Sequence, residues 1–162
     1  MEPRLCFIKE EYFQKNSAFV KMLDTENAGK QSKRTHLCIM ICLDENHYYI
    51  PLRNHLGSEI RKFGRIGHAV PSEKRESAGL DYRYALIVND DAYIEWQAEK
   101  KIPRSQYRKI KNEYEMIQAE FTVYLSGFIR AAKKQRHDRE PLYRESSLVN
   151  FMSELNIRAG KQ

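Results

Sequence analysis

A long amphipathic stripe in the C-terminal half is the feature that most constrains the fold. Its apolar side chains recur at spacings of three and four, at Ile110, Tyr114, Ile117, Phe121, Tyr124, Leu125 and Phe128. Such positions share one face of an α-helix, so the pattern predicts a long helix from Ser105 to about Gln135, with Ser105 as the N-cap. Gly127 inside it costs about 1 kcal/mol relative to alanine, which indicates a kink or a close contact.

The N-terminal half favours strands. Apolar or β-branched runs predict strands at residues 5–8, 35–43, 48–52 and 82–88, and a short edge strand at 68–71. Helices are expected at 10–23 and from Ser146 or Ser147 to Leu155, while residues 53–66 suit a short helix or a structured loop. Strands come first and helices later, which predicts an α+β fold. A length of 162 residues suits one domain, residues 1–162, with a hydrophobic core.

The charge balance favours a polyanionic partner. The chain has 28 Lys and Arg against 22 Asp and Glu, a net charge of +6, and a pI of about 9.2. The cations gather around residues 30–34, 53–65 and 130–139, and ten tyrosines are scattered among them. Tyrosine beside cations offers base stacking together with phosphate neutralisation, which is how single-stranded RNA is usually held. The composition therefore favours nucleic acid without specifying its kind.

Targeting and cysteine signals indicate the cytoplasm. No apolar run is long enough to span a bilayer, and residues 1–4 do not resemble a signal peptide, so we expect a cytoplasmic protein without a membrane partner. Cys6, Cys38 and Cys42 are odd in number and lack metal-ligand spacing. We expect them to be small buried apolar residues, with a disulfide or metal binding as the alternative.

Several common chemistries lack their motifs. The sequence has no Gly-rich phosphate loop of either standard spacing, no His-Glu-x-x-His and no Cys-x-x-Cys. Acidic residues do not cluster in the predicted strands, so two-metal nuclease chemistry lacks its ligands. We therefore expect no cofactor and no metal site. A metal-free ribonuclease needs none of these motifs, because RNA carries its own 2′-OH nucleophile.

One short run combines the side chains that such a reaction needs. The strand-like residues 47–52 end at Pro51-Leu52 and are followed directly by Arg53, Asn54 and His55. Proline suits a strand edge or end, because it has no backbone N–H. A strand end is a rigid place from which to aim a cation, an amide and an imidazole. The alternative is that these residues are ordinary solvated members of a turn.

Arginine and histidine side chains have defined tasks in cleaving RNA. The 2′-OH attacks the adjacent phosphorus, so the protein has to position the strand, assist proton transfer and stabilise charge on the non-bridging oxygens. Arginine suits the last task because its planar fork donates bidentately to phosphate, and Arg34 and Arg53 are the candidates. Histidine exchanges protons near neutral pH, which makes His55 the candidate for proton transfer.

Three motifs together resemble a known family. Lys33-Arg34-Thr35 leads into an apolar strand, Ile50-Pro51-Leu52-Arg53 follows, and Gly79-Leu80-Asp81-Tyr82 precedes Ala85-Leu86-Ile87. In order and spacing they resemble the RNase toxins of type III toxin–antitoxin systems, closest to the TenpN type and more distantly the ToxN and AbiQ toxins. The resemblance covers most of the chain, since the long helix and residues 147–151 also fall where that family has them.

The resemblance implies a fold, an activity and a partner. Such toxins have a compact core of twisted antiparallel strands wrapped by helices, similar to the Kid/MazF toxins. They are metal-independent endoribonucleases that leave 2′,3′-cyclic phosphate ends. A small pseudoknot RNA antitoxin inhibits each one by filling the active groove, and toxin and RNA assemble into a closed ring. Abortive defence against bacteriophage is their usual role.

Part of the family's site carries over directly. The basic residue before the first long strand falls on Arg34, with Lys33 adjacent, and the Pro-Leu motif falls on Pro51-Leu52. The next family position, often Arg in TenpN-type toxins and Thr in ToxN, falls on Arg53.

Two positions depart from the family. The serine needed for activity is replaced by Asn54, whose amide donates a hydrogen bond but has no useful proton-transfer pKa. The lysine that ToxN places two residues after that serine falls on Leu56. Three alternatives follow: His55 performs the acid–base work, Lys62 supplies the missing cation, or activity is weak or lost.

These arguments select two groups of residues. The candidate catalytic residues are Arg34, Arg53, Asn54 and His55. The candidates for holding RNA are Tyr12, Lys30, Lys33, Thr35, Lys62, Arg65, Tyr82 and Arg83. The second functional hypothesis is a protein of the same fold that binds RNA but no longer cuts it, and Asn54 is the observation that favours it.

Overall fold

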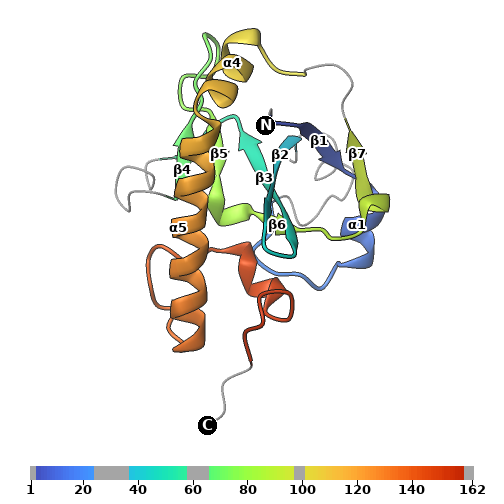
Figure 1. Ribbon diagram of the computed structural model, residues 1–162, viewed down its shortest axis with the longest axis vertical. Helices are drawn as coiled ribbons and strands as arrows, with labels where there is room; N and C mark the ends of the chain where they lie inside the picture. Colours follow the sequence, from blue (N-terminus) through green and yellow to red (C-terminus); the bar gives the residue numbers. More distant parts are fainter. Residues whose placement is uncertain (1–2, 24–36, 58–65, 97–100, 159–162) are drawn as a thin grey trace.

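Seven antiparallel strands and a 20-residue helix form the framework of the protein (Figure 1). The computed structural model describes residues 3–23, 37–57, 66–96 and 101–158. Along the sheet the strand order is β4-β5-β3-β2-β1-β7, and β6 pairs with β3. The strands are β1 Leu5–Ile8, β2 Leu37–Leu43, β3 Asn46–Arg53, β4 Gly67–Ala69, β5 Gly79–Asp81, β6 Leu86–Ile87 and β7 Ile94–Trp96. In the described residues the helices are α1 Glu10–Lys15, α4 Arg104–Asn112 and α5 Tyr114–Lys133, with 3₁₀ turns η2 Tyr82–Tyr84, η3 Asp91–Tyr93 and η4 Ser147–Phe151.

This architecture confirms the predicted α+β fold. The expected hairpin is β2–β3, in which Ile39 faces Ile50 across the ladder and both side chains are buried. Its turn places Asp44 at φ 53°, a left-handed conformation that aspartate tolerates better than most residues. The predicted edge strand is β4. None of the helices in the described part of the chain is both long and apolar enough to cross a membrane.

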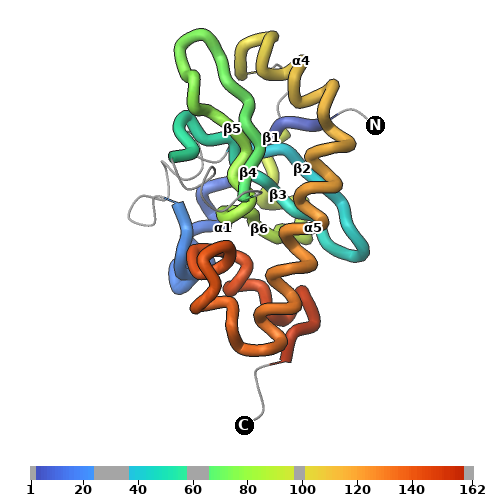
Figure 2. The backbone as a smooth tube through the Cα atoms, turned by 90° about the vertical axis from the view of Figure 1, so that its left-hand side faces the viewer, coloured from blue at the N-terminus to red at the C-terminus, as the bar shows by residue number. Residues whose placement is uncertain are grey.

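The core lies where α5 packs on the sheet (Figures 1 and 2). The Phe121 ring is fully buried, with centroids 5.2 Å from Tyr48 of β3 and 5.7 Å from Tyr82 of η2. Burial of one such ring contributes about 1.5–3 kcal/mol. The Tyr114 hydroxyl donates to the Met40 carbonyl at 2.8 Å, which fixes the start of α5 on β2. The stripe identified in the sequence is therefore the buried face of α5 from Tyr114 onward, with Ile110 buried on α4.

The predicted single helix from Ser105 to Gln135 is two helices. The break is at Glu113, whose backbone has φ −107° and ψ 14° and belongs to neither helix. Its carboxylate accepts from Lys109 at 2.7 Å and lies 3.0 Å from Nε2 of His68, the buried histidine of β4. The Lys109 hydrogen bond is the largest cause lowering the pKa of Glu113, while burial opposes it and His68 assists it. The helix start also differs, because α4 begins at Arg104 with Pro103 as its N-cap instead of Ser105.

The N-terminal helix is shorter than predicted. It ends at Lys15 rather than at residue 23, and the Asn16 side chain donates to the Tyr12 carbonyl at 2.8 Å. Beyond it, the backbone N–H of Val20 donates to the Asn150 side chain at 2.9 Å, and Phe19 packs edge-on against Phe151. Contacts with the C-terminal segment thus replace further helical turns.

Other expectations near the C-terminal half need correction. The predicted strand 82–88 is interrupted by η2, because the Asp81 side chain accepts from the Arg83 N–H and caps a 3₁₀ turn. Strand β7, which pairs with β1, was not predicted from the sequence. The final helix is the short 3₁₀ helix η4, capped by Ser146.

The three cysteines differ in their burial. Cys6 and Cys38 are buried and burial raises the pKa of the Cys6 thiol to about 12, whereas Cys42 is exposed. The prediction of three buried cysteines is therefore wrong for Cys42.

Gly127 marks a close contact, one of the two alternatives that its place in the helix predicted. A Cβ there would lie 1.8 Å from the hydroxyl oxygen of Tyr143, whose buried ring packs against Phe128 and Tyr124. We expect Gly127→Ala to lower the free energy of unfolding by about 1–3 kcal/mol, because overpacking outweighs the gain in helix propensity. Urea denaturation measures this, with the exposed neighbour Ser126→Ala as a control that should change little. Stabilisation by Gly127→Ala would contradict the expected clash.

Candidate functional site

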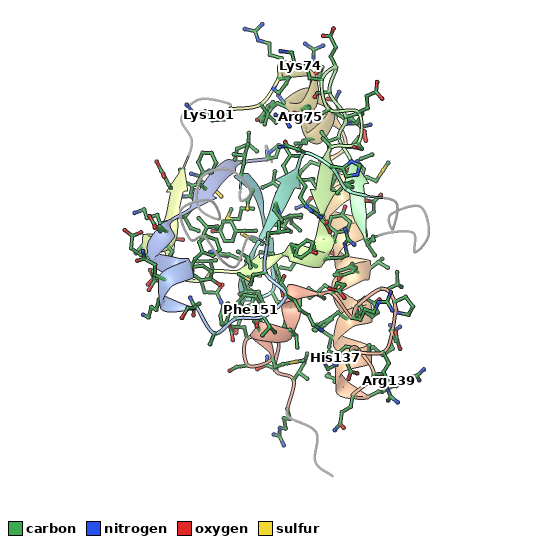
Figure 3. The ribbon with its side chains drawn as sticks, turned by 180° about the vertical axis from the view of Figure 1, so that it is seen from behind. Lys74, Arg75, Lys101, His137, Arg139 and Phe151 are labelled. Atoms are coloured by element: carbon green, nitrogen blue, oxygen red, sulfur yellow. The ribbon has the colours of Figure 1, made fainter. Side chains whose placement is uncertain are left out.

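A cleft of about 1070 Å³ opens where β3 ends. One wall is the end of β3 and the residues after it, 52–55. Two further walls are the β4–β5 loop, residues 72–75, and the segment around the start of α4, residues 101–103, 105 and 106. Phe7, Leu23 and Leu37 line an apolar side. Figure 3 shows Lys74, Arg75 and Lys101 at this end of the molecule, far from His137 and Arg139 at the other end. The cleft therefore brings together three segments that are distant in the sequence.

The pairing of β3 explains why Pro51 is tolerated within it. On one side β3 pairs with β2 throughout, including Cys38 opposite Pro51. On the other side it pairs with β6 at Tyr48 and Tyr49, and then with β5 at Leu52 and Arg53. Pro51 falls in the interval between those two pairings, where the strand has less need of a backbone N–H. The strand can therefore run on to Arg53 at the edge of the cleft.

A fully buried carboxylate, Asp81, holds Arg53 in place. Arg53 Nη1 donates to Asp81 Oδ2 at 3.0 Å, and Arg83 donates to both carboxylate oxygens at 3.0 and 2.8 Å. The Arg53 guanidinium also lies 5.2 Å from the centroid of the Tyr84 ring. Its side chain stays 28% exposed, which leaves N–H groups available to a ligand. Arg53 is thus a fixed cation at the cleft and not a freely solvated one.

The chain after Arg53 is anchored through Leu56. Its side chain is buried against Gly79, where a Cβ would approach Leu56 Cδ1 to 2.4 Å, so this packing requires glycine. The Leu56 N–H donates to the Ser77 carbonyl at 2.9 Å, and its carbonyl accepts from Arg83 Nη2 at 3.3 Å. Leu56 therefore anchors the loop that follows Arg53.

His55 and Asn54 line the cleft beside this anchor. The His55 ring is hydrogen-bonded through Nδ1 to the hydroxyl of Ser77. Asn54 is exposed, so its amide is accessible to a ligand. The cation, amide and imidazole expected from the sequence are therefore brought together at one cleft.

Three cations of the opposite walls, Lys74, Arg75 and Lys101, were not among the candidates predicted from the sequence. Lys74 and Arg75 lie on the β4–β5 loop, in which Ser72 and Arg75 exchange backbone hydrogen bonds at 3.0 and 3.1 Å. Lys101 precedes α4. Among the described lining residues Glu73 is the one carboxylate, so the cleft has a positive balance that favours an anion. The available signal was a charged loop, Glu73 to Glu76, lying between two strands close to the Gly79-Leu80-Asp81-Tyr82 motif.

Three predicted RNA-binding residues are internal in the structure. Tyr12 and Tyr82 are buried at 5% and 0% exposure, and their hydroxyls donate to the Ile87 carbonyl and to Glu120. Burial raises the pKa of both hydroxyls well above its usual range. Neither ring has an exposed face on which an RNA base could stack. Their assignment as RNA-binding residues is therefore wrong, and both belong to the core. Arg83 is 8% exposed and donates hydrogen bonds to the Asp81 carboxylate and the Leu56 carbonyl, so it is not placed to bind RNA at the surface.

The remaining candidates lie outside the described residues, and they are Lys30, Lys33, Arg34, Thr35, Lys62 and Arg65. Within the described part of the chain, no three His, Cys, Asp or Glu side chains gather in a way that could hold a metal ion.

Asp81 should be indispensable to this site. We expect Asp81→Asn to lower the free energy of unfolding by about 3 kcal/mol, because it leaves Arg53 and the buried Arg83 without their countercharge. Chemical denaturation tests this, with the exposed Asp138→Asn as the matched control that should change little. If both variants unfold like the wild type, the Asp81 network does not support the fold.

Comparisons with known proteins place the fold among solved structures. No family model matches the chain. No curated protein matches it in sequence either. One similar structure is AbiQ, described as a lactococcal anti-phage endoribonuclease of the type III toxin–antitoxin system. It superposes with a TM-score of 0.61 and 15% sequence identity, and the match covers 96% of this chain and 98% of AbiQ. Another similar structure comes from a study of bacterial type III toxin–antitoxin systems, in which a non-coding RNA pseudoknot selectively inhibits the toxin. It superposes with a TM-score of 0.63 and 12% sequence identity, and the match covers 98% of this chain and 100% of that one. The chain therefore has the same α+β fold as these two proteins along nearly its whole length.

Proposed function

We propose that this protein is a metal-independent endoribonuclease toxin of a type III toxin–antitoxin system. The observation that carries the proposal is the placement of a fixed Arg53 and a hydrogen-bonded His55 at one cationic cleft. The proposal is supported by the shared fold, because AbiQ is described as an endoribonuclease of that class. The Pro-Leu-Arg and Gly-Leu-Asp-Tyr motifs favour the TenpN type within it.

The proposed reaction uses the nucleophile of the RNA itself. The 2′-OH attacks the adjacent phosphorus, the bond to the 5′ oxygen breaks, and a 2′,3′-cyclic phosphate remains. Arg53 donates from the N–H groups that Asp81 leaves free to the non-bridging oxygens, where negative charge develops. Asn54 adds an amide donor, and His55 transfers the proton. Asp81 acts through Arg53, which it holds at the cleft.

The other cations of the cleft hold the strand. Lys74, Arg75 and Lys101 line the walls apart from β3, so they can neutralise phosphates on either side of the scissile one. Arg34 is proposed to act with Arg53 on the scissile phosphate. The sequence-based candidates Lys30, Lys33, Thr35, Lys62 and Arg65 are proposed to extend the same contact along the RNA.

A second RNA is proposed as the inhibitor. A structured RNA that fills the cleft would meet the same cations as the substrate, which makes a pseudoknot antitoxin a fitting partner. The resemblance further suggests a cyclic toxin–RNA assembly and a role in phage defence. The toxin would act in the cytoplasm, where its RNA targets are.

The alternative function is RNA binding without cleavage. Two observations favour it: Asn54 stands where the family has its serine, and the residue at the lysine position, Leu56, is buried. This alternative uses the same cleft and differs only in the fate of the bound RNA.

Cleavage by purified protein separates the two functions. We expect the protein in EDTA to cut cellular RNA and leave 2′,3′-cyclic phosphate ends, because the substrate supplies the nucleophile. A single 2′-deoxy substitution at the cut site should abolish cleavage there without preventing binding. A folded protein that binds RNA and never cuts it would establish the alternative.

Substitutions at the β3 end test the site itself. We expect Arg53→Ala and His55→Ala each to lower kcat by about 10²–10⁴-fold, through loss of charge stabilisation and of proton transfer. Single-turnover cleavage of a defined RNA measures this, and relief of growth arrest on expression provides a second readout. Arg139→Ala and His137→Ala are the matched controls, since both residues lie at the opposite end of the molecule (Figure 3). Wild-type cleavage by both cleft variants would place the active site elsewhere.

A further inference from the structure

The loop that precedes β5 contacts the 55–56 segment twice through one residue. The Ser77 carbonyl accepts from the Leu56 N–H at 2.9 Å, and the Ser77 hydroxyl is hydrogen-bonded to His55 Nδ1. The backbone hydrogen bond to Leu56 fixes the position of Ser77 and thus of its hydroxyl. Leu56 is itself held in place by its close packing against Gly79. Within the described residues the His55 ring makes its hydrogen bond through Nδ1, which leaves Nε2 for a ligand in the cleft.

The direction of the Ser77–His55 hydrogen bond determines what Nε2 can do. In a neutral imidazole one nitrogen carries the proton and the other is the base, and a serine hydroxyl can either accept from Nδ1–H or donate to the Nδ1 lone pair. When the Ser77 oxygen accepts from Nδ1–H, Nε2 keeps its lone pair and can take a proton. The same bond persists in the imidazolium, because Nδ1–H remains a donor in both protonation states.

We propose that Ser77 is a positioning residue that holds the His55 imidazole with its proton on Nδ1 and its basic Nε2 directed to the RNA 2′-OH. The inference rests on the proposed function and adds a residue that the sequence motifs do not assign. Ser77 touches no substrate atom in this scheme and acts only through His55.

The proton balance of the step is simple. The 2′ oxygen forms its bond to phosphorus while its proton passes to Nε2, and the bond from phosphorus to the 5′ oxygen breaks. The leaving 5′ oxygen takes a proton back from the imidazolium, which restores the neutral ring. Ser77 accepts from Nδ1–H throughout and is not itself protonated or deprotonated.

The ring signals of His55 test the positioning without any cleavage. In ¹⁵N NMR spectra above the imidazole pKa, we expect the wild type to show the Nδ1–H tautomer at His55, identified by the loss of its signals in His55→Ala. Ser77→Ala should shift the ring toward the Nε2–H tautomer, and Ser77→Thr should restore the wild-type pattern. An Nε2–H ring in the wild type, or an unchanged ring in Ser77→Ala, would overturn the inference.

Kinetics test whether that positioning matters. Ser77→Ala should lower kcat by about 10–100-fold with KM nearly unchanged, by analogy with other residues that orient a functional histidine, and Ser77→Thr should recover most of it. Ser126→Ala, an exposed serine on α5, is the control for the chemical change and should keep wild-type rates. In a His55→Ala background the Ser77→Ala change should have no further effect, because Ser77 then has no imidazole to orient.

The outcomes separate the inference from the proposed function. Equal losses from Ser77→Ala with and without His55 would show a general structural role and overturn the inference. If the wild type never cuts RNA, the proposed function fails, and so does the contribution of Ser77 to cleavage. The ring signals would still show whether Ser77 holds His55.

Discussion

The cleft depends on one buried carboxylate. Burying a charge is costly unless it is paired, and Asp81 is paired twice, with Arg53 on one side and Arg83 on the other. Arg53 presents its remaining N–H groups to the cleft. Arg83 also donates a hydrogen bond to the Leu56 carbonyl, and the Leu56 N–H donates to the Ser77 carbonyl. Through these bonds Asp81 positions both the guanidinium and, more indirectly, the imidazole, although neither is a neighbour of Asp81 in the sequence.

A second polar cluster supports the same edge of the sheet from the other strand. His68 of β4 lies opposite Leu80 in the ladder, one position from Asp81, and both its ring nitrogens lie against carboxylates, of Glu113 and Glu120. Glu120 also accepts from the Tyr82 hydroxyl at 2.8 Å. These bonds tie the β4–β5 hairpin to α5 and to the junction before it. The loop that carries Lys74, Arg75 and Ser77 is therefore held at its base by hydrogen bonds from buried His68 to two glutamates, which is a suitable foundation for a site that binds a polyanion.

Sequence patterns predicted the elements whose signals are local. The β2–β3 hairpin and the buried face of α5 follow from alternation and from three-and-four spacing, and both are present. The errors come from tertiary contacts that override such patterns: the helix break at Glu113 accompanies bonds to Lys109 and His68, and the strand expected at 82–88 bends where Asp81 caps a turn. Tyr12 and Tyr82 were assigned to RNA because an isolated tyrosine gives no sign of which face is covered.

The sequence by itself determined the class of fold, the positive charge balance, and the succession of Arg53, Asn54 and His55 at the end of a strand. Those properties depend on composition and on neighbours along the chain. Only the tertiary structure decided that Lys74, Arg75 and Lys101 line the same cleft, that Asp81 holds Arg53, and that Ser77 meets His55. Asp81 lies 28 residues from Arg53 and Ser77 lies 22 residues from His55. The geometry of these contacts is set by how β3, β5 and their loops pack, which no short-range pattern encodes.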